Sequence, residues 1–204
     1  MALASLDDRP PRDRGPRLAQ TPLRLTLLPH DVLPEGFCWR LVDGYIRSLS
    51  WDADGESMTL GIWGPGSWVS TDFISLRPLE LQCLTAVVVE HALPTTADLQ
   101  QALSEHLHIL EELFQINRVR SAEDRLLHLL VWIGRRFGMV NSQGHRISLR
   151  ELNLTHKALG DICGLTRVTV TKNLSLFRQR GILRDVGHGD LLITSNPFIQ
   201  SSLP

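Results

Sequence analysis

The most constraining feature of the sequence is the segment 154–174, which fits two short helices joined by a tight turn. Thr155 stands where a helix N-cap is expected, and Gly164 supplies the left-handed backbone conformation that such a turn needs. Thr166 is placed to cap the second helix. Apolar residues then recur at spacings of four and three, at Val170, Leu174 and Phe177. The sequence therefore predicts a helix-turn-helix.

The second of these helices carries a polar face opposite its apolar stripe, because successive residues turn by about 100°. Arg167 opens that face at the end of the helix that enters the DNA major groove in such motifs, so it is the first candidate for reading a base. Arginine and lysine donate to guanine, whereas valine and threonine methyl groups contact thymine methyl groups. The candidate DNA-contacting residues are Thr155, Arg167, Val168, Thr169, Thr171, Lys172 and Ser175.

Two further features favour DNA over simple helix packing. Residues 181–193 read as two short strands around a Gly-His-Gly turn, which predicts a hairpin wing beside the helices. The window 145–184 holds eight Lys/Arg against two Asp/Glu. We interpret the segment as a winged helix-turn-helix that binds double-stranded DNA.

Charge is divided unevenly along the chain, although the formal net charge is only −1. Residues 1–112 carry 8 Lys/Arg and 16 Asp/Glu, a net charge of −8, and residues 113–204 carry 13 and 6, a net charge of +7. This asymmetry suggests that the C-terminal half meets a polyanion, although charge alone is equally compatible with a solvated basic face.

The N-terminal half predicts an antiparallel β domain behind an unstructured tail. Residues 1–22 are rich in Arg, Asp and Pro and hold few large apolar residues, so we expect no ordered structure there. From residue 23 to about 94, short runs with period-two alternation are separated by Gly, Pro and Asp, as in short antiparallel strands. Residues 51–56 predict a hairpin turn, with 58–63 as the returning strand.

A long helix should follow, over residues 95–120, with Thr95 or Thr96 as its cap. Its apolar or special positions are spaced 4, 3, 4, 3 and 4 residues apart, as in the seam of a coiled coil. The predicted dimer-interface residues are Leu99, Leu103, His106, Leu110, Leu113 and Asn117. The alternative is a helix that packs on its own domain. Ser121 to Gly138 predicts a second helix that opens the basic region.

Several classes of protein and site are disfavoured. No apolar run approaches the roughly 20 residues of a membrane span, and Cys38, Cys83 and Cys163 are scattered, which favours a reducing cytoplasm and no iron–sulfur cluster. We expect no metal site, because the histidines lack metal-site spacing. We find no catalytic constellation, so we expect no enzyme.

The order of β domain, long helix, helix-turn-helix and wing resembles the Crp/Fnr family of bacterial regulators over residues 23 to about 195. The segments 166–172 and 135–138 look like the global nitrogen regulator branch found in cyanobacteria. The resemblance implies a homodimer on a palindrome with half-sites like GTA and TAC, with Arg167, Val168 and Lys172 at the base-contact positions. Lys172 replaces the branch's arginine, so the sequence preference stays open.

The β domain resembles the family's cyclic-nucleotide fold through residues 41–44 and 60–66, but its phosphate cassette differs. Residues 66–72 contain no glutamate after the glycine, and Arg77, at the position of the phosphate-binding arginine, is followed by Pro78 in a shortened cassette. We therefore expect neither a cyclic nucleotide nor any other cofactor. An anionic effector such as 2-oxoglutarate would use Arg77, which is equally compatible with a surface role.

The predicted fold class is α+β: an N-terminal antiparallel β-roll at 23–94, a dimerisation helix at 95–120 and a winged helix-turn-helix at 121–204, after a tail at 1–22. The predicted function is a sequence-specific transcription regulator, with RNA polymerase and an unidentified small-molecule effector as further candidate partners. The alternative is a ligand-sensing or adaptor module that acts through a protein partner, which Trp51, Trp63 and Trp68 in the acidic β domain suggest.

Overall fold

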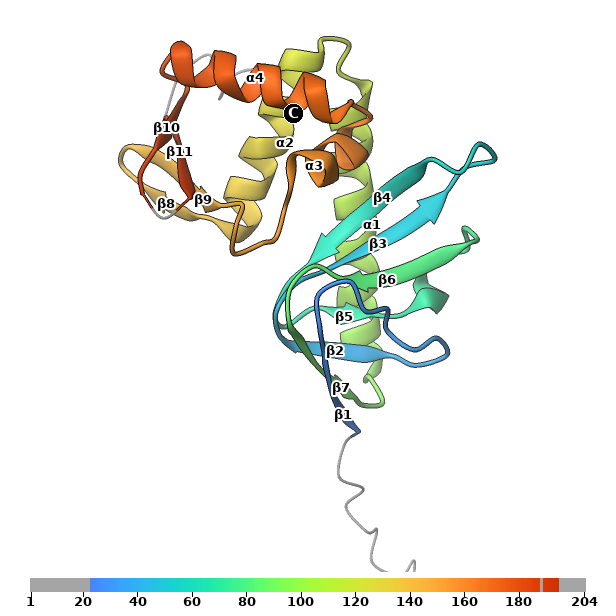
Figure 1. Ribbon diagram of the computed structural model, residues 1–204. Helices are drawn as coiled ribbons and strands as arrows, with labels where there is room; N and C mark the ends of the chain where they lie inside the picture. Colours follow the sequence, from blue (N-terminus) through green and yellow to red (C-terminus); the bar gives the residue numbers. More distant parts are fainter. Residues whose placement is uncertain (1–22, 188, 195–204) are drawn as a thin grey trace, which may run out of the picture.

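A computed structural model of the chain describes residues 23–187 and 189–194. A β-roll and a smaller helical domain are joined by one long helix that runs past both (Figure 1). This arrangement confirms the predicted α+β class. The predicted tail at 1–22 lies outside the described residues, and so does His188 at the tip of the predicted wing. None of the helices in the described ranges has the length and hydrophobicity of a membrane span.

The β-roll consists of two antiparallel sheets. One has the order β1–β7–β2–β5 and the other β4–β3–β6. The elements are β1 (Arg24–Leu27), β2 (Trp39–Asp43), β3 (Ile46–Trp51), β4 (Ser57–Trp63), β5 (Trp68–Val69), the 3-10 turn η1 (Thr71–Phe73), β6 (Leu79–Cys83) and β7 (Val87–His91). The predicted hairpin turn at 51–56 connects β3 to β4, whose register pairs Trp51 with Ser57 and Ile46 with Trp63.

Alternation along these strands fills the space between the two sheets. Trp39, Leu41, Val87 and Val89 come from the first sheet, and Ile46, Trp63 and Leu81 from the second; all are at most 1% exposed. Burial of such side chains contributes about 1.5–3 kcal/mol each. The β domain therefore has a core of its own, as its alternating pattern predicts.

Gly44 allows the sharp turn between β2 and β3. Its φ is +82°, and a Cβ added there would lie 2.1 Å from the carbonyl oxygen of Ala86. Both the left-handed conformation and the close approach of another backbone exclude a side chain at this position.

The long helix α1 (Thr96–Arg118) begins where the sequence predicts. The Thr95 side chain accepts from the backbone N–H of Asp98, whose carboxylate accepts from the Thr95 N–H, so a complete capping box fixes the first turn. The helix packs against β4, β5 and α2.

The structure corrects the predicted seam of α1. His106 and Leu113 are 3% exposed and lie in the chain's own core, so they are not available to a partner chain. Both residues lie on the face of α1 that packs against β4 and β5 and covers that side of the β-roll. Asn117 instead bonds within the chain, through Nδ2, to the carbonyl oxygens of Leu113 and Ile162.

A different apolar stripe of α1 faces outward. Leu103, Leu107 and Phe114 are 45%, 62% and 68% exposed, and the partly exposed Leu110 lies between them. Their spacing of 4, 3 and 4 is again that of a coiled-coil seam. Of the six residues predicted for the interface, Leu103 and Leu110 belong to this stripe, while Leu99 is partly exposed one turn before it.

The C-terminal domain is built on α2 (Ala122–Phe137), which Ser121 caps and Gly138 ends, as predicted. The strands β8 (Met139–Asn141), β9 (Gly144–Ser148), β10 (Leu183–Asp185) and β11 (Asp190–Thr194) form one sheet in the order β10–β11–β9–β8. The hairpin β10–β11 is the predicted wing. The hairpin β8–β9 is not predicted by the sequence analysis; the signal that could mark it is the polar turn Asn-Ser-Gln-Gly at 141–144.

The close approach at Gly44 leads to a stability prediction. Gly44→Ala should lower the free energy of unfolding more than Gly36→Ala, although both glycines have a positive φ, of 82° and 76°. Alanine meets about 1–2 kcal/mol of left-handed strain at either position. The backbone clash adds about 1–3 kcal/mol at Gly44 only, because the space around Gly36 is open. Urea unfolding, followed by tryptophan fluorescence, measures the free energy of unfolding of both variants. An equal loss of that free energy in the two variants would contradict the role of the backbone clash.

Candidate nucleic-acid interface

The helix-turn-helix consists of α3 (His156–Cys163) and α4 (Arg167–Gln179). Thr155 caps α3 by accepting from the N–H of Ala158, and Gly164 follows the helix with a φ of 60°. A Cβ added to Gly160 would lie 2.3 Å from the carbonyl oxygen of Leu165. Gly160 therefore lets the turn approach the first helix closely and fixes how α4 leaves it.

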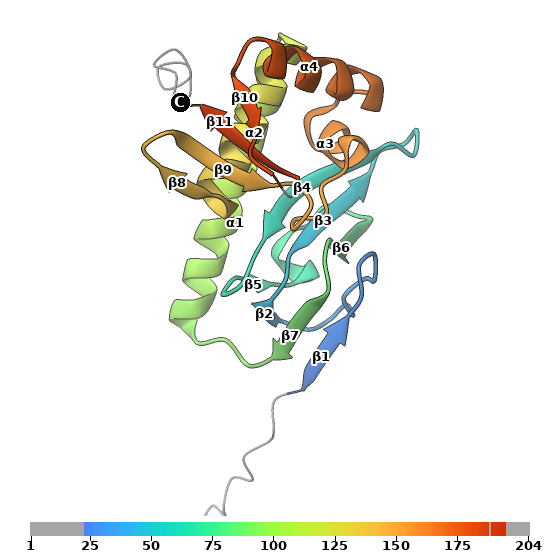
Figure 2. The same cartoon turned by 60° about the vertical axis from the view of Figure 1, so that its left-hand side comes forward.

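Helix α4 begins at a second cap and buries one stripe. Thr166 accepts from the N–H of Thr169 at 3.2 Å. Val170, Leu174 and Phe177 are fully buried, as the spacing predicts. α3 lies between α4 and β4, and in both views α4 lies at the end of the molecule away from β1 and β7 (Figures 1 and 2). The remaining face of α4 is consequently open to solvent.

The predicted contact residues occupy this open face to different degrees. Arg167, Val168 and Lys172 are exposed, with Val168 at 62%. Thr171 and Ser175 are exposed too, but their hydroxyls donate to carbonyl oxygens one turn earlier, those of Arg167 and Thr171. Thr171 and Ser175 therefore present mainly their carbon atoms and hydroxyl lone pairs outward.

Two predicted residues have structural roles at the helix starts. Thr169 is partly buried, and its hydroxyl lies 2.9 Å from the Thr166 hydroxyl. Thr155 is exposed while it caps α3. Their hydroxyls stabilise the first turns of the two helices, and the exposed arginine, valine and lysine form the most accessible part of the face.

Sequence reasoning missed His156, the first residue of α3. Its Nδ1 lies 2.9 Å from Thr171 Oγ1 on α4, across the turn. It lines a shallow pocket of about 290 Å³ with Thr155, Arg150, Arg178 and Gly189. No pattern in the sequence relates positions 156 and 171, because they meet only once the two helices cross.

Ion pairs fix the wing beside these helices. Arg178 of α4 donates from Nε to both carboxylate oxygens of Asp185 on β10, at 3.0 and 3.3 Å. Arg146 of β9 pairs with Asp190 of β11 at 2.6 Å. The exposed Arg178–Asp185 pair contributes modestly, about 0–1 kcal/mol, so its main effect is to orient β10 relative to α4.

The helix-turn-helix is attached to the rest of the chain through backbone carbonyls. Asn117 at the end of α1 donates to Ile162 O at 3.2 Å, and Arg125 of α2 donates to Cys163 O at 3.1 Å. Asn153, before α3, donates to Leu84 O in the β-roll at 2.7 Å. Contacts with α1, α2 and the β-roll thus fix the position of α3. The tight turn between α3 and α4 then fixes the position of α4.

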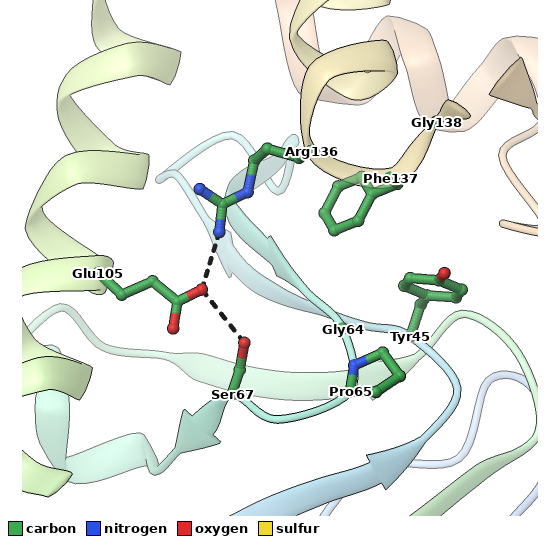
Figure 3. A pocket seen from close by; sticks show the side chains of 8 residues that line it. All are labelled: Tyr45, Gly64, Pro65, Ser67, Glu105, Arg136, Phe137 and Gly138. Carbon is green, nitrogen blue, oxygen red and sulfur yellow. Dashed lines mark hydrogen bonds and ion pairs between the residues drawn. The ribbon is translucent and has the colours of Figure 1, made fainter. Parts of the chain in front are cut away.

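A pocket of about 450 Å³ lies at the junction of α1, α2 and the β4–β5 connection (Figure 3). The Glu105 carboxylate accepts from Arg136 at 2.8 Å and from Ser67 Oγ at 3.2 Å. The Arg136 guanidinium also lies 5.8 Å from the ring centroids of Trp132 and Phe137. The charges lining the pocket are therefore already paired with each other, and the network ties the three elements together.

Side chains fill the interior of the β-roll beside α1. The His106 ring stacks on Trp63 at 4.6 Å and meets Phe73 edge-on at 5.2 Å. Its Nε2 donates to Trp68 O at 3.2 Å. Burial is the main cause that lowers the pKa of His106, and it outweighs the Trp68 carbonyl and Glu105, which raise it. At neutral pH the His106 ring that joins α1 to the β-roll is therefore uncharged.

Arg77, the predicted effector residue, is occupied by its own loop. Its guanidinium donates to the carbonyl oxygens of Thr71, Ile74 and Leu76. These bonds hold the connection between η1 and β6. The structure thus gives Arg77 a local role, which leaves few of its five N–H donors for an anion.

No group of three or more His, Cys, Asp or Glu side chains in residues 23–187 and 189–194 is arranged to hold a metal ion. The three cysteines are free thiols. Burial raises the pKa of Cys83 and of Cys163 to about 11, so both are protonated at neutral pH.

Residues 124–196 match the model of the Crp-like helix-turn-helix domain. The chain is 39% identical over 162 residues to the regulatory protein CysR of Synechococcus elongatus, and the match covers 78% of this chain and 79% of that protein. It is 32% identical over 114 residues to the global nitrogen regulator of Synechocystis sp., which covers 54% of this chain and 49% of that protein.

Solved structures share the whole architecture. FixK2 from Bradyrhizobium japonicum superposes with a TM-score of 0.70 at 16% identity, covering 88% of this chain and 96% of that one. A CRP/FNR family transcriptional regulator from Thermus thermophilus superposes with a TM-score of 0.67 at 20% identity, covering 88% and 97%. At these identities the likeness shows a common fold.

The cap of α4 leads to the second prediction. Thr166→Ala should destabilise the protein by about 1 kcal/mol, because the N–H of Thr169 loses its acceptor. Thr166→Ser keeps the oxygen and should retain most of that stability. Chemical unfolding measures the loss, and hydrogen exchange at Thr169 locates it. A serine variant as unstable as the alanine variant would show that the methyl group, not the cap, matters.

Proposed function

The chain belongs to the Crp/Fnr family of transcription regulators, and we propose that it binds a palindromic DNA site as a homodimer. The observation that carries the proposal is the open face of α4, where Arg167, Val168 and Lys172 project from the N-terminal half of a capped helix. Arginine and lysine supply donors for guanine, and valine supplies an apolar contact for a thymine methyl group. Thr155, Thr169, Thr171 and Ser175 complete the proposed contact surface.

A homodimer accounts for the outward stripe of α1. Leu103, Leu107, Leu110 and Phe114 lie along one line of the helix, and no part of the described chain covers Leu107 or Phe114. Large apolar side chains in a heptad spacing are buried when two such helices pair. In the proposed dimer a two-fold axis along α1 relates the two copies of α4, and a symmetric dimer calls for a palindromic site. The family resemblance implies half-sites like GTA and TAC.

The proposed division of the chain follows from these roles: a β-roll at 23–94, a dimerisation helix at 95–120 and the DNA-binding domain at 121–204. We propose that the β-roll takes no cyclic nucleotide, since Arg77 bonds to backbone carbonyls and Trp63 with His106 occupies the interior beside α1. RNA polymerase, and an effector of another kind, are proposed partners. The free thiols fit a cytoplasmic location.

The third prediction concerns Arg167. Arg167→Ala should weaken binding to the palindrome by about 1–3 kcal/mol and reduce the discrimination against other bases at the contacted position. Fluorescence anisotropy with palindromic and scrambled duplexes, at one salt concentration, measures both effects. Arg40→Ala is the matched control, because it removes the same charge from an exposed position on β2.

Two outcomes would contradict this assignment. An equal loss of affinity on every duplex would reassign Arg167 to a phosphate contact. Equal affinity of the unchanged protein for palindromic and scrambled duplexes would refute sequence-specific binding altogether.

The fourth prediction concerns the dimer. Leu107→Glu should weaken dimerisation by roughly a hundredfold, because a carboxylate without a partner would be buried between the two helices. Sedimentation velocity over a range of protein concentrations measures the shift towards the monomer. Leu93→Glu is the control, since Leu93 is 90% exposed and precedes α1. A Leu107→Glu protein that sediments like its control would place the interface elsewhere.

A further inference from the structure

His156 occupies a position that the DNA backbone would approach if α4 lay in the major groove. It opens α3 directly after the cap Thr155, so it belongs to a helix start whose first backbone N–H groups have no carbonyl partner within the helix. The pocket that it lines is bounded by Arg150, Arg178 of α4, and Asp185 and Gly189 of the wing, and the Asp185 carboxylate is paired with Arg178. Helix starts and arginines of this kind favour an anion.

The hydrogen bonds of Thr171 fix which ring nitrogen of His156 carries hydrogen. A hydroxyl has one hydrogen, and Thr171 donates it to the carbonyl oxygen of Arg167 at 2.9 Å, since a carbonyl can only accept. Thr171 Oγ1 must therefore accept from His156 Nδ1, which lies 2.9 Å away. In the neutral ring this leaves Nε2 without hydrogen, as an acceptor only.

A phosphate oxygen is also only an acceptor, so it cannot bond to a neutral His156 in this tautomer. The protonated ring is different: Nδ1–H keeps its bond to Thr171, and Nε2–H becomes a charged donor. The bond to Thr171 is thus compatible with both protonation states of His156, whereas the phosphate contact requires the protonated state.

The surroundings of His156 oppose protonation as long as DNA is absent. Burial is the first cause that lowers its pKa below the ordinary 6.5, followed by the cations Arg178 and Arg167 of α4. Of the other charged groups nearby, Arg150 shares the pocket, Asp185 of β10 is paired with Arg178, and Lys157 is paired with Asp161 on α3 itself. A phosphate beside Arg178 would offset the coulombic part of this penalty.

We propose that His156 is a DNA-backbone contact that functions in its protonated form, so that each protomer takes up a proton at His156 when it binds DNA. This inference rests on the proposed DNA-binding surface of α4. By linkage, a group that gains a proton on binding makes the affinity greater at lower pH. The affinity for DNA therefore falls with rising pH between two limits. The lower limit is the pKa of His156 in the free protein, which lies below 6.5, and the upper limit is the pKa of His156 in the complex.

The test measures affinity against pH. Anisotropy titrations with a rhodamine-labelled palindromic duplex, at constant ionic strength, would run from about pH 5.5 to about pH 8. A rise of one unit in the His156 pKa on binding corresponds to an affinity change of about tenfold per protomer across this range. His156→Gln keeps a side-chain N–H for Thr171 but cannot ionise, and it should lose this dependence. His156→Arg carries a permanent charge and should bind tightly at every pH.

The matched control is His128→Gln on α2. Burial lowers the pKa of His128 as well, so this variant shows whether any partly buried histidine of the domain would give the same slope. It should keep the dependence of the unchanged protein. NMR of histidine-labelled protein, with and without the duplex, should show a higher His156 pKa in the complex, and the His156→Gln spectrum identifies the signal.

Each contrary outcome has a defined meaning. A His156→Gln protein with an unchanged pH dependence, or a His156 resonance that titrates alike in the free and bound protein, would overturn the inference and leave the DNA-binding surface intact. A loss of the dependence in His128→Gln would assign it to that residue instead. Failure to prefer the palindrome at any pH would overturn the proposed surface, and the inference with it.

Discussion

Helix α1 carries apolar side chains on two faces, and the chain itself covers only one of them. Ala102, His106, Ile109, Leu113 and Ile116 turn inward against the β-roll and α2. The stripe from Leu103 to Phe114 turns outward. The inward face joins the β-roll and the helix-turn-helix domain into one core, and the outward face gives the molecule its proposed symmetry axis. In the proposed dimer the same helix would set the distance from that axis to each recognition helix.

This role of α1 depends on firm attachment at both ends. The capping box at Thr95 orders its start, and the His106–Trp63 stack fixes its middle in the β-roll. At its far end Asn117 bonds to the last turn of α3, and the Arg136–Glu105–Ser67 network links α2 back to α1 and to the β4–β5 connection. These hydrogen-bonded contacts connect the β-roll to α3 through α1 and α2 without a flexible linker.

Local signals in the sequence predicted the helices, their caps and the wing, but not the hairpin β8–β9 or the contacts between distant residues. The caps at Thr155 and Thr166 and the turn at Gly164 involve neighbours a few residues away, so their chemistry can be read directly. The seam of α1 could not be placed, because apolar residues at heptad spacing occur on both faces and only the position of the β-roll decides which one is covered. Arg77 and His156 depend on folding in the same way: the loop carbonyls around the first and Thr171 beside the second become neighbours only in the folded chain.

The two halves of the chain carry opposite net charges, −8 for residues 1–112 and +7 for residues 113–204. The acidic N-terminal portion repels a polyanion, whereas the basic portion includes α4, which lies at the end of the molecule away from the β-roll strands β1 and β7 (Figure 2). Long-range repulsion at one end and attraction at the other orient the protein before contact, because steering depends on the whole charge distribution. Encounter then brings α4 and the start of α3 to the DNA together. Burial and, after it, Arg178 and Arg167 lower the pKa of His156 in the free protein. In the proposed complex a phosphate beside Arg178 would offset part of that effect, so DNA binding would favour protonation of His156.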